Sequence, residues 1–386
     1  MLHIAVDTIV TRPPFTYRGM FEYTKKMLEY FRLLAQEYDV NVRTYVGSGF
    51  PPEITGLPET EHYQTVSSPL MDNLRRWRFG GGARLIKRDG NDVVFGTHAE
   101  TLSLSGTPFV VMLHDVAFLR FRQYNWLYTA RLYAVYSLAV HSAKLVLTDS
   151  ECSKRDIVEL LHVPPEKVLV TYLGCNRDLY NEQSVEEEQA ALRKRFSFNR
   201  RYILHHGTFQ PRKNLLRLVR AYDRLISSGR AADYDLVLAG NYGWNCEDVL
   251  QACREVKGPG RVVLTGFLAE KELAALVKGA YLSVVPSAYE GFCFPMVESM
   301  ACGIPTVVAD NSCLPEISGG VLHYFNAESV EQIADAIRVG LEDEELRSRL
   351  RRDGLRRASE FSWERCARET LTALKRVAAS SQRAQL

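Results

Sequence analysis

The chain is 386 residues long, which exceeds one ordinary hydrophobic core, so two domains are expected. Hydrophobic residues make up 46% and charged residues 24%, as in an ordinary globular protein, and the formal net charge of +2 gives no reason to expect a nucleic-acid partner. No apolar run reaches the roughly 18 residues that a membrane-spanning helix needs.

Apolar runs rich in β-branched residues alternate with helical patterns in the first half of the chain. Five runs are expected to be strands: HIAVDT (3–8), VNVRTYV (40–46), DVVFGT (92–97), FVVMLHD (109–115) and KLVLTDS (144–150). Continuous apolar runs of this length indicate parallel strands that helices cover on both faces. Met1 leads directly into the first run without a cationic leader, so we expect no secretion signal.

The strand rhythm pauses in a charged stretch, expected to be a linker over 181–198, and then restarts. Five further strands are expected: YILHHGT (202–208), DLVLAG (235–240), RVVLTG (261–266), LSVVPS (282–287) and TVVAD (306–310). We therefore predict an α/β protein with two doubly wound, Rossmann-like domains, 1–180 and 199–365, whose parallel sheets present their carboxyl edges to a shared cleft. A last helix, 366–386, is expected to pack back toward the N-terminal domain.

The segment PSAYEGFCFPMVESMACGIPTVVAD (286–310) places Glu290 and Glu298 with seven residues between them. The pattern predicts a loop that holds Glu290, followed by a helix from Pro295 that holds Glu298 and stops at Gly303. Loop N–H groups and the helix amino end make an anion site, and two flanking carboxylates suit a ligand that carries hydroxyls as well as phosphate. The alternative is a loop Glu290 in solvent and a Glu298 that merely stabilises its helix dipole.

This segment resembles the E-x7-E signature of family 4 glycosyltransferases, which are retaining enzymes of GT-B architecture with two facing Rossmann-like domains. Other segments resemble the family in the right order: FVVMLHD, KLVLTDSECSKRDIVELLHVPPEKVLVTYLGCN, HHGTFQPRKNLLRLVRAY, VVLTGFLAEKELAALVKGAYLSVVPS and FSWERCARETL. The resemblance spans nearly the whole chain and extends to bacterial cell-surface polysaccharide mannosyl and rhamnosyl transferases.

The resemblance implies a donor site in the C-terminal domain. Glu290 would contact the transferred sugar, Glu298 the ribose hydroxyls, and Lys213 the diphosphate, which gains charge as the glycosidic bond breaks. Relatives often carry an arginine where Thr208 stands, and Arg212 can supply that charge; the alternative for Arg212 and Lys213 is a solvated helix start. The other implied donor-binding positions are Thr208, Phe267, Leu268, Gly291, Phe292, Cys293 and Phe294. Cys293 replaces a common glycine and can narrow the sugar pocket.

In the N-terminal domain the resemblance implies a sugar-transfer centre at the His114–Asp115 pair. His114 would be catalytic and lie near the donor sugar, while Asp115 would either orient the histidine ring or cap the next helix. Gly19, between the first strand and a helix, is expected to let the backbone approach a phosphate. Ser150 and Ser153 are expected to cap a helix.

The implied reaction is transfer of a hexose, with retention of configuration, from a nucleotide sugar to a hydroxyl of a saccharide or lipid-linked acceptor. GDP-mannose is the first donor expected and a UDP-sugar the second. We expect protein cations to neutralise the diphosphate, with no metal and no other cofactor. A sugar-nucleotide epimerase and a non-catalytic sugar-nucleotide-binding protein on the same fold stay open as alternatives.

Two aromatic stretches bear on the acceptor and on location. The basic stretch DNLRRWRFGGGARLIKRDG (72–90) suits either an anionic membrane surface or a solvated helix. FRQYNWLYTARLYAVY (121–136) is expected mainly to pack in the core, although aromatic rings also stack on sugars. The eight cysteines form no C-x-x-C pair and favour a reducing compartment. We expect a cytoplasmic protein with peripheral contact at the cytoplasmic face of the inner membrane.

Overall fold

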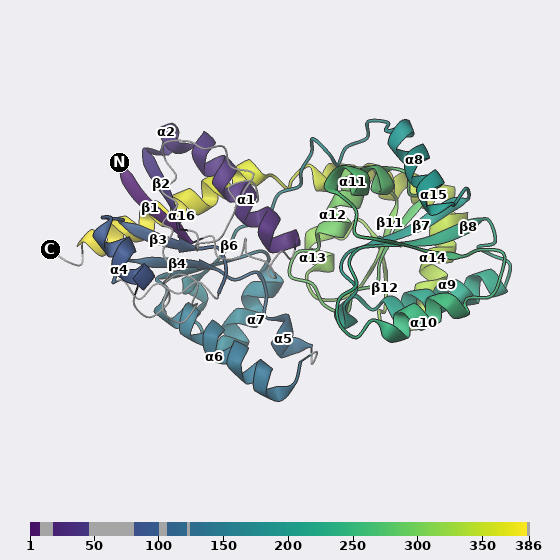
Figure 1. The fold of residues 1–386 in the computed structure, drawn as a ribbon, viewed down its shortest axis with the longest axis horizontal. Helices are drawn as coiled ribbons and strands as arrows, with labels where there is room; N and C mark the ends of the chain where they lie inside the picture. Colours follow the sequence, from purple (N-terminus) through teal and green to yellow (C-terminus); the bar gives the residue numbers. More distant parts are fainter. Residues whose placement is uncertain (8–17, 46–80, 100–105, 122–123, 384–386) are drawn as a thin grey trace. The chain divides into compact units, whose positions relative to one another are not determined.

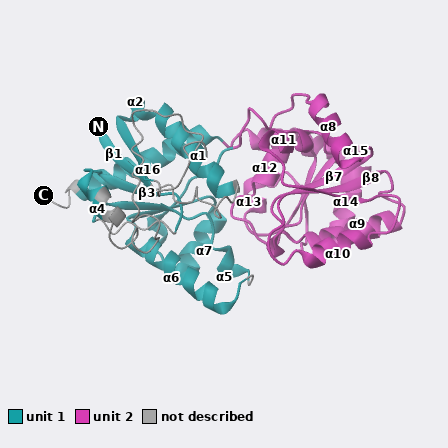
Figure 2. Ribbon diagram, viewed as in Figure 1, with its two compact units in different colours: residues 1–174, 362–386 teal, residues 175–361 magenta. Residues whose placement is uncertain are grey.

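The computed structural model describes residues 1–7, 18–45, 81–99, 106–121 and 124–383 (Figure 1). The chain divides into two compact units (Figure 2): unit 1 holds residues 1–174 and 362–386, and unit 2 holds residues 175–361. The sequence placed these divisions a few residues later, at 180 and 365. The stretch 181–198, predicted to be a linker, lies within unit 2.

The stretch 181–198 is polar because its helix lies at the surface of unit 2. Helix α8 (Glu186–Phe196) buries only Leu192 among its residues and contacts α11 (Glu270–Lys278). A helix with one buried side chain shows little apolar periodicity, so the sequence pattern resembled a linker.

Unit 1 is an α/β unit built around a parallel sheet. Its described elements are β1 (Leu2–Asp7), α1 (Arg18–Leu33), α2 (Ala35–Tyr38), β2 (Val40–Tyr45), α4 (Gly81–Arg88), β3 (Val93–Gly96), β4 (Phe109–Met112), α5 (Ala117–Arg120), α6 (Trp126–Ser142), β5 (Leu145–Thr148), α7 (Glu151–Leu161), a 3₁₀ turn (Pro165–Lys167), β6 (Val168–Val170) and α16 (Trp363–Arg383). The strand order in the described part is β2-β1-β3-β4-β5-β6, and every pairing is parallel.

Unit 2 repeats this plan with its own parallel sheet. Besides α8 and α11, it contains β7 (Arg201–His206), a 3₁₀ turn (Pro211–Lys213), α9 (Leu215–Ser227), β8 (Tyr234–Ala239), α10 (Glu247–Glu255), β9 (Val262–Gly266), β10 (Leu282–Val285), α12 (Phe294–Ala301), β11 (Thr306–Ala309), α13 (Leu314–Ser318), β12 (His323–Phe325), α14 (Val330–Glu342) and α15 (Glu344–Ala358). The strand order is β12-β11-β10-β7-β8-β9. Helices cover both faces of this sheet (Figure 1).

The strand orders locate the edges where ligands gather. In unit 2 the order reverses between β7 and β10, and in unit 1 between β1 and β3. Parallel α/β sheets bind ligands outside the carboxyl ends of strands at such a reversal. The residues that follow β7 and β10 are therefore the natural lining of a site in unit 2.

All ten predicted strands are confirmed among the described residues, with ends that agree within one to three residues; the largest difference is the run 109–115, where β4 already ends at Met112. Two were missed, β6 and β12, because each spans three residues at the edge of its sheet and gives almost no pattern. The central strands β3, β4, β10 and β11 are buried along their whole length. Complete burial explains their continuous apolar runs, since helices cover both faces.

Helix α16 returns the end of the chain to unit 1, where it packs against α1. Its first residue crosses Gly174 so closely that a Cβ at Gly174 would lie 2.2 Å from the backbone nitrogen of Trp363. Cys366 is fully buried on the same helix, and its Sγ lies 3.9 Å from Sδ of Met27. The last helix is therefore part of the unit 1 core.

The aromatic stretch 121–136 differs in part from expectation. Trp126 on α6 is 76% exposed, and Tyr128 and Tyr133 are also exposed, so core packing was the wrong prediction for these three. Tyr136 does pack inward, with its ring 4.9 Å from that of Phe118. Residues 122–123 and 72–80 lie outside the described residues. Among the described helices, none combines the length and apolar character needed to cross a membrane.

Candidate functional site: a carboxylate held by two cations

The loops after β7 and β10 meet at the reversal point of the unit 2 sheet. After β7, Gly207 has φ of +142°. After β8, a side chain at position 240 in place of Gly240 would put its Cβ 2.0 Å from the carbonyl oxygen of Gly207, so the two loops approach closely there. Asn214, with φ of +59°, donates from Nδ2 to the carbonyl oxygens of Pro286 (3.0 Å) and Ala327 (2.7 Å). Asn214 thereby ties the loop after β7 to the loop after β10, and the sequence had not singled it out.

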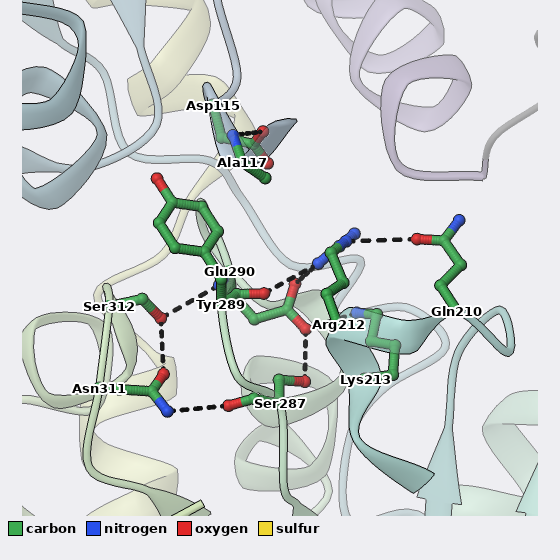
Figure 3. Close-up of polar contacts among 10 residues, drawn as sticks. All are labelled: Asp115, Ala117, Gln210, Arg212, Lys213, Ser287, Tyr289, Glu290, Asn311 and Ser312. Carbon is green, nitrogen blue, oxygen red and sulfur yellow. Dashed lines mark hydrogen bonds and ion pairs between the residues drawn. The ribbon is translucent and has the colours of Figure 1, made fainter. Parts of the chain in front are cut away.

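Glu290 lies at this junction and binds both predicted cations (Figure 3). Its Oε1 accepts from Lys213 Nζ at 2.5 Å and from Ser287 Oγ at 2.6 Å, and its Oε2 accepts from Arg212 Nη1 at 2.6 Å. We call Arg212, Lys213, Ser287 and Glu290 the Glu290 cluster. Glu290 and Lys213 are both buried, so the solvated alternatives for the loop glutamate and for the lysine are wrong.

The two neighbouring cations keep Glu290 ionised. Burial by itself would raise the pKa of Glu290, but Arg212 and Lys213 outweigh it and lower that pKa to about 2. Arg212 is directed inward: its Nη1 also donates to the Tyr289 carbonyl oxygen at 3.1 Å, and its Nε to Gln210 Oε1 at 3.2 Å. Glu290 is therefore an ionised carboxylate with both oxygens bound, a poor proton acceptor at neutral pH.

Polar residues after the next strand hold the Glu290 loop in place. The backbone N–H of Glu290 donates to Ser312 Oγ at 3.1 Å, and Ser312 donates to Asn311 Oδ1 at 3.0 Å. Asn311 Nδ2 in turn donates to the carbonyl oxygen of Ser287 at 3.0 Å (Figure 3). Asn311 and Ser312 follow β11, the neighbour of β10, and their polar character at a strand's carboxyl end was the signal that could have found them.

The second glutamate has a different partner. Glu298 lies on α12, and its Oε2 accepts a hydrogen bond from His206 Nε2 at 2.8 Å, with both residues buried. His206 is the last residue of β7, and its Nδ1 is buried with no partner among the described residues. The sequence placed Glu298 on this helix but did not select His206.

The other predicted donor-binding residues are spread over several loops. Phe292 is buried and packs edge-on against Phe294 and Phe361, at ring distances of 5.4 Å each. Cys293 precedes α12 with φ of +75°, the left-handed region where glycine is favoured, and burial raises its thiol pKa to about 12. Gly291 joins Glu290 to this aromatic turn.

Phe267 and Leu268 follow β9, at the far edge of the sheet from β12, whereas Thr208 is the second residue after β7. Phe267 is 65% exposed and Leu268 is buried. The sequence contains one Asp-x-Asp triplet, 233–235, at the amino end of β8 and thus at the opposite edge from the Glu290 cluster. The described residues contain no group of three or more metal-ligating side chains.

In unit 1, the predicted histidine meets a carboxylate that the sequence had not selected. His114 Nδ1 lies 3.1 and 3.0 Å from the two carboxylate oxygens of Asp149, which follows β5 and is buried. We call these two residues the His114 pair. Asp115 bonds to the backbone instead: its Oδ1 accepts from the N–H of Ala117, the first residue of α5, at 2.9 Å.

The surroundings of the His114 pair come from both ends of the chain. Tyr23 on α1 packs its ring edge-on to His114 at 4.9 Å, and Trp363 on α16 lies 6.2 Å from Tyr23. Ser150 caps α7 by accepting from the N–H of Ser153 at 3.1 Å, as predicted. Gly19 is the second residue of α1, so its predicted place between the first strand and the helix was wrong.

Two family models match the chain and between them span most of it. Residues 19–179 match the model described as Glycosyltransferase Family 4, and residues 188–357 match Glycosyl transferases group 1. The matched ranges fall one on each compact unit, apart from the few residues near the division at 174.

Similar curated proteins include several mannosyltransferases. The O-antigen chain mannosyltransferase B of Escherichia coli is 34% identical over 61% of this chain and 62% of its own length. The serotype-specific mannosyltransferase WbdA of E. coli is 28% identical over 62% of this chain and 30% of its own length. The MMP alpha-(1->4)-mannosyltransferase of Mycolicibacterium hassiacum is 30% identical over 61% of this chain and 55% of its own length. The matched stretches thus span between about a third and under two thirds of these relatives.

Solved structures share the fold over nearly the full length. A sucrose-phosphate synthase from Thermosynechococcus elongatus superposes with a TM-score of 0.74 at 17% identity, covering 98% of this chain and all of that one. Anabaena Alr3699/HepE, in complex with UDP-glucose, gives 0.73 at 19% identity, covering 97% and 100%. The described residues form two parallel sheets of six strands each, and both family models match the chain. The chain therefore belongs to the family 4 glycosyltransferases and has the GT-B fold.

Proposed function

We propose that this protein transfers a hexose, mannose in the first instance, from a nucleoside-diphosphate sugar to a hydroxyl of a saccharide or lipid-linked saccharide. The observation that carries the proposal is the Glu290 cluster, where a buried acid is bound by two cations at the reversal point of a parallel sheet. Family membership supports group transfer, and the named mannosyltransferase relatives support mannose.

The chemistry of the leaving group accounts for the two cations. A nucleoside diphosphate gains negative charge as the glycosidic bond breaks, so a preorganised positive site stabilises the transition state. Lys213 and Arg212 lie side by side for this task, and Glu290 holds them there. A bound diphosphate would compete with Glu290 for the same cations, and Glu290 would then be able to accept hydrogen bonds from the sugar.

The charge of Glu290 bears on the stereochemical course. A general base is most effective when its pKa lies near the working pH, and the pKa of Glu290 is about 2. Retaining glycosidases need a carboxylate nucleophile paired with a second carboxyl about 5 Å away. In the Glu290 cluster the partners are cations and a hydroxyl instead. We propose retention by a front-face route in which the leaving phosphate oxygen accepts the proton of the acceptor hydroxyl.

Fixed cations also make the proposed reaction independent of divalent metal and of any other cofactor. Glu298, held by His206, is proposed to bind the ribose hydroxyls of the donor. GDP-mannose is the first candidate donor, and a UDP-sugar is the second, because the Alr3699/HepE structures contain UDP-glucose or UDP. With a lipid-linked acceptor, the proposed place of action is the cytoplasmic face of the membrane.

The test is a panel of nucleotide sugars, screened by thermal shift and then by transfer to saccharide acceptors with and without EDTA. We expect one donor to raise the melting temperature most and to support transfer that EDTA leaves unchanged. An altered free sugar nucleotide without acceptor would indicate an epimerase instead. Binding without hydrolysis or transfer across a broad acceptor panel would indicate a non-catalytic binding protein.

A further inference from the structure

We propose that Asp149 is a positioning residue for His114, one that keeps hydrogen on Nδ1 and leaves Nε2 as the ring atom that meets the transferred sugar. This rests on the proposed function and on the place near the donor sugar that the family resemblance implies for His114. Strands β4 and β5 are neighbours in the sheet, so the residues that follow them emerge at one edge, and this brings together two side chains 35 positions apart.

The hydrogen-bond chemistry assigns the two ring nitrogens. An ionised carboxylate can only accept, so the Nδ1 that lies 3.0 Å from Asp149 must carry a hydrogen, whether the ring is neutral or protonated. Nε2 is buried and has no partner among the described residues. It therefore accepts a hydrogen bond from a sugar hydroxyl when the ring is neutral and donates one when the ring is protonated.

Packing against Tyr23 also restrains the plane of the His114 ring. The ring of Tyr23 stands at 86° to the His114 ring. Asp115 does not compete for Nδ1, because its carboxylate accepts from Ala117 N. A rotation of the imidazole would break the contact with Asp149, so ring orientation and hydrogen placement are set together.

The groups that face the pair come from four elements. Asp115 adjoins His114, Asp149 follows β5, Tyr23 lies on α1, and Cys366 lies on α16. Burial raises the pKa of Tyr23 and of Cys366 well above their usual values, so both stay uncharged. Asp149 and Asp115 are the acidic groups that act on the pKa of His114. Burial by itself lowers the pKa of His114, but Asp149 raises it overall.

Nitrogen NMR of His114 separates the two aspartates. In the wild-type protein we expect hydrogen on Nδ1 and a free Nε2 above the histidine pKa. Asp149→Ala should abolish this preference and lower the histidine pKa, and Asp149→Asn should keep the hydrogen on Nδ1 but still lower the pKa. The matched control, Asp115→Asn, should retain the wild-type tautomer. An unchanged tautomer and pKa in Asp149→Ala would overturn the proposal.

Kinetics then tests the consequence for transfer, with the donor identified by the panel. Misplacement of a reacting group by about 1 Å can cost on the order of 10²-fold, so kcat of Asp149→Ala should fall by about that factor with little change in donor KM. The limb of the rate profile that follows His114 should move to lower pH by the shift that NMR measures. If Asp149→Ala does not fold, the isosteric Asp149→Asn carries the same comparison through its pH profile.

The two proposals fail separately. A wild-type protein that transfers nothing from any nucleotide sugar would defeat the proposed function, while the tautomer measurement still decides whether Asp149 controls the histidine ring. Full kcat and an unmoved pH profile in both Asp149 variants, in an active enzyme, would show that Asp149 does not position a functional group.

Discussion

The Glu290 cluster in unit 2 and the His114 pair in unit 1 solve the same problem in different ways. Each holds a buried acidic side chain at the carboxyl edge of a parallel sheet. Glu290 is bound by an arginine and a lysine, whereas Asp149 is bound by a histidine, a side chain that can gain or lose its charge and whose pKa Asp149 raises.

The difference indicates a division of labour. Fixed charge suits the binding of the doubly esterified diphosphate of a nucleotide sugar, whose charge does not change near pH 7, and a low pKa keeps Glu290 from exchanging protons. An adjustable proton suits a group that must recognise or polarise a hydroxyl. The pH dependence of the reaction should therefore originate in unit 1, and the strength of nucleotide binding in unit 2.

The largest expected effect comes from removing a cation. Lys213→Met leaves Glu290 buried with Arg212 alone, so we expect turnover to fall by about 10³-fold and the free energy of unfolding to fall by about 3 kcal/mol. Transfer assays and chemical denaturation measure both. The control is Arg224→Ala, which breaks an exposed pair with Glu331 (3.2 Å) and should cost less than about 1 kcal/mol. Equal losses of turnover and stability in Lys213→Met and Arg224→Ala would contradict the role proposed for Lys213.

Glu290→Gln should move binding and catalysis in opposite directions. Without the competing carboxylate, Arg212 and Lys213 are free for phosphate, and one charge-assisted hydrogen bond of about 1.5–3 kcal/mol corresponds to about tenfold or more in affinity. Calorimetry should show tighter binding of the bare nucleoside diphosphate, while turnover falls by about 10²-fold. Glu331→Gln, an exposed glutamate in the same unit, should change neither. If Glu290→Gln loses both nucleoside-diphosphate affinity and turnover, the carboxylate does not compete with the diphosphate for Arg212 and Lys213.

A pH series sharpens the contrast within unit 2 itself. Burial lowers the pKa of His205 to about 3, so the unfolded chain binds a proton between about pH 6.5 and 3 that the folded chain does not. Stability from His205 is complete above pH 6.5 and decreases toward pH 3, by up to about 1.4 kcal/mol per pH unit. His205→Gln should make the denaturation midpoint less dependent on pH in that window. The stability that ionised Glu290 contributes is lost at lower pH, between about pH 4.5 and 2. If His205→Gln leaves the slope of the denaturation midpoint against pH unaltered above pH 4.5, the low pKa of His205 is contradicted.

The smallest effect concerns the residue beside Asp149. Ser150→Ala removes the cap of α7 and should cost about 1 kcal/mol of stability, measured by denaturation. The position of the rate profile on the pH axis should stay as in the wild type. A shifted profile would mean that local helix packing, rather than the Asp149 carboxylate, controls His114.

Much of the unit 2 site could be predicted, because its key residues lie in two short segments. The Glu290 loop, the helix that carries Glu298, and Lys213 were all placed correctly along the chain. Ser287, Asn311 and His206 were missed, although each is polar and stands within two residues of a strand's carboxyl end. Without the strand order, such residues cannot be assigned to one edge.

In unit 1, adjacency in sequence suggested the wrong partner for the histidine. Asp115 follows His114 directly, yet its carboxylate turns to the N–H of Ala117. The true partner, Asp149, stands after the neighbouring strand. Ring orientation depends on which strands pair, and no local pattern contains that information.

The sequence by itself determined the strands, the helix boundaries near Glu298 and the family, because apolar periodicity, capping residues and short motifs are local properties of a chain. The tertiary structure alone decided the partners of the charges: Glu290 with Arg212 and Lys213 across 78 and 77 positions, Glu298 with His206 across 92, and Asp149 with His114 across 35. Such contacts are set by strand order and by burial, which bring distant residues together where water cannot replace their hydrogen bonds.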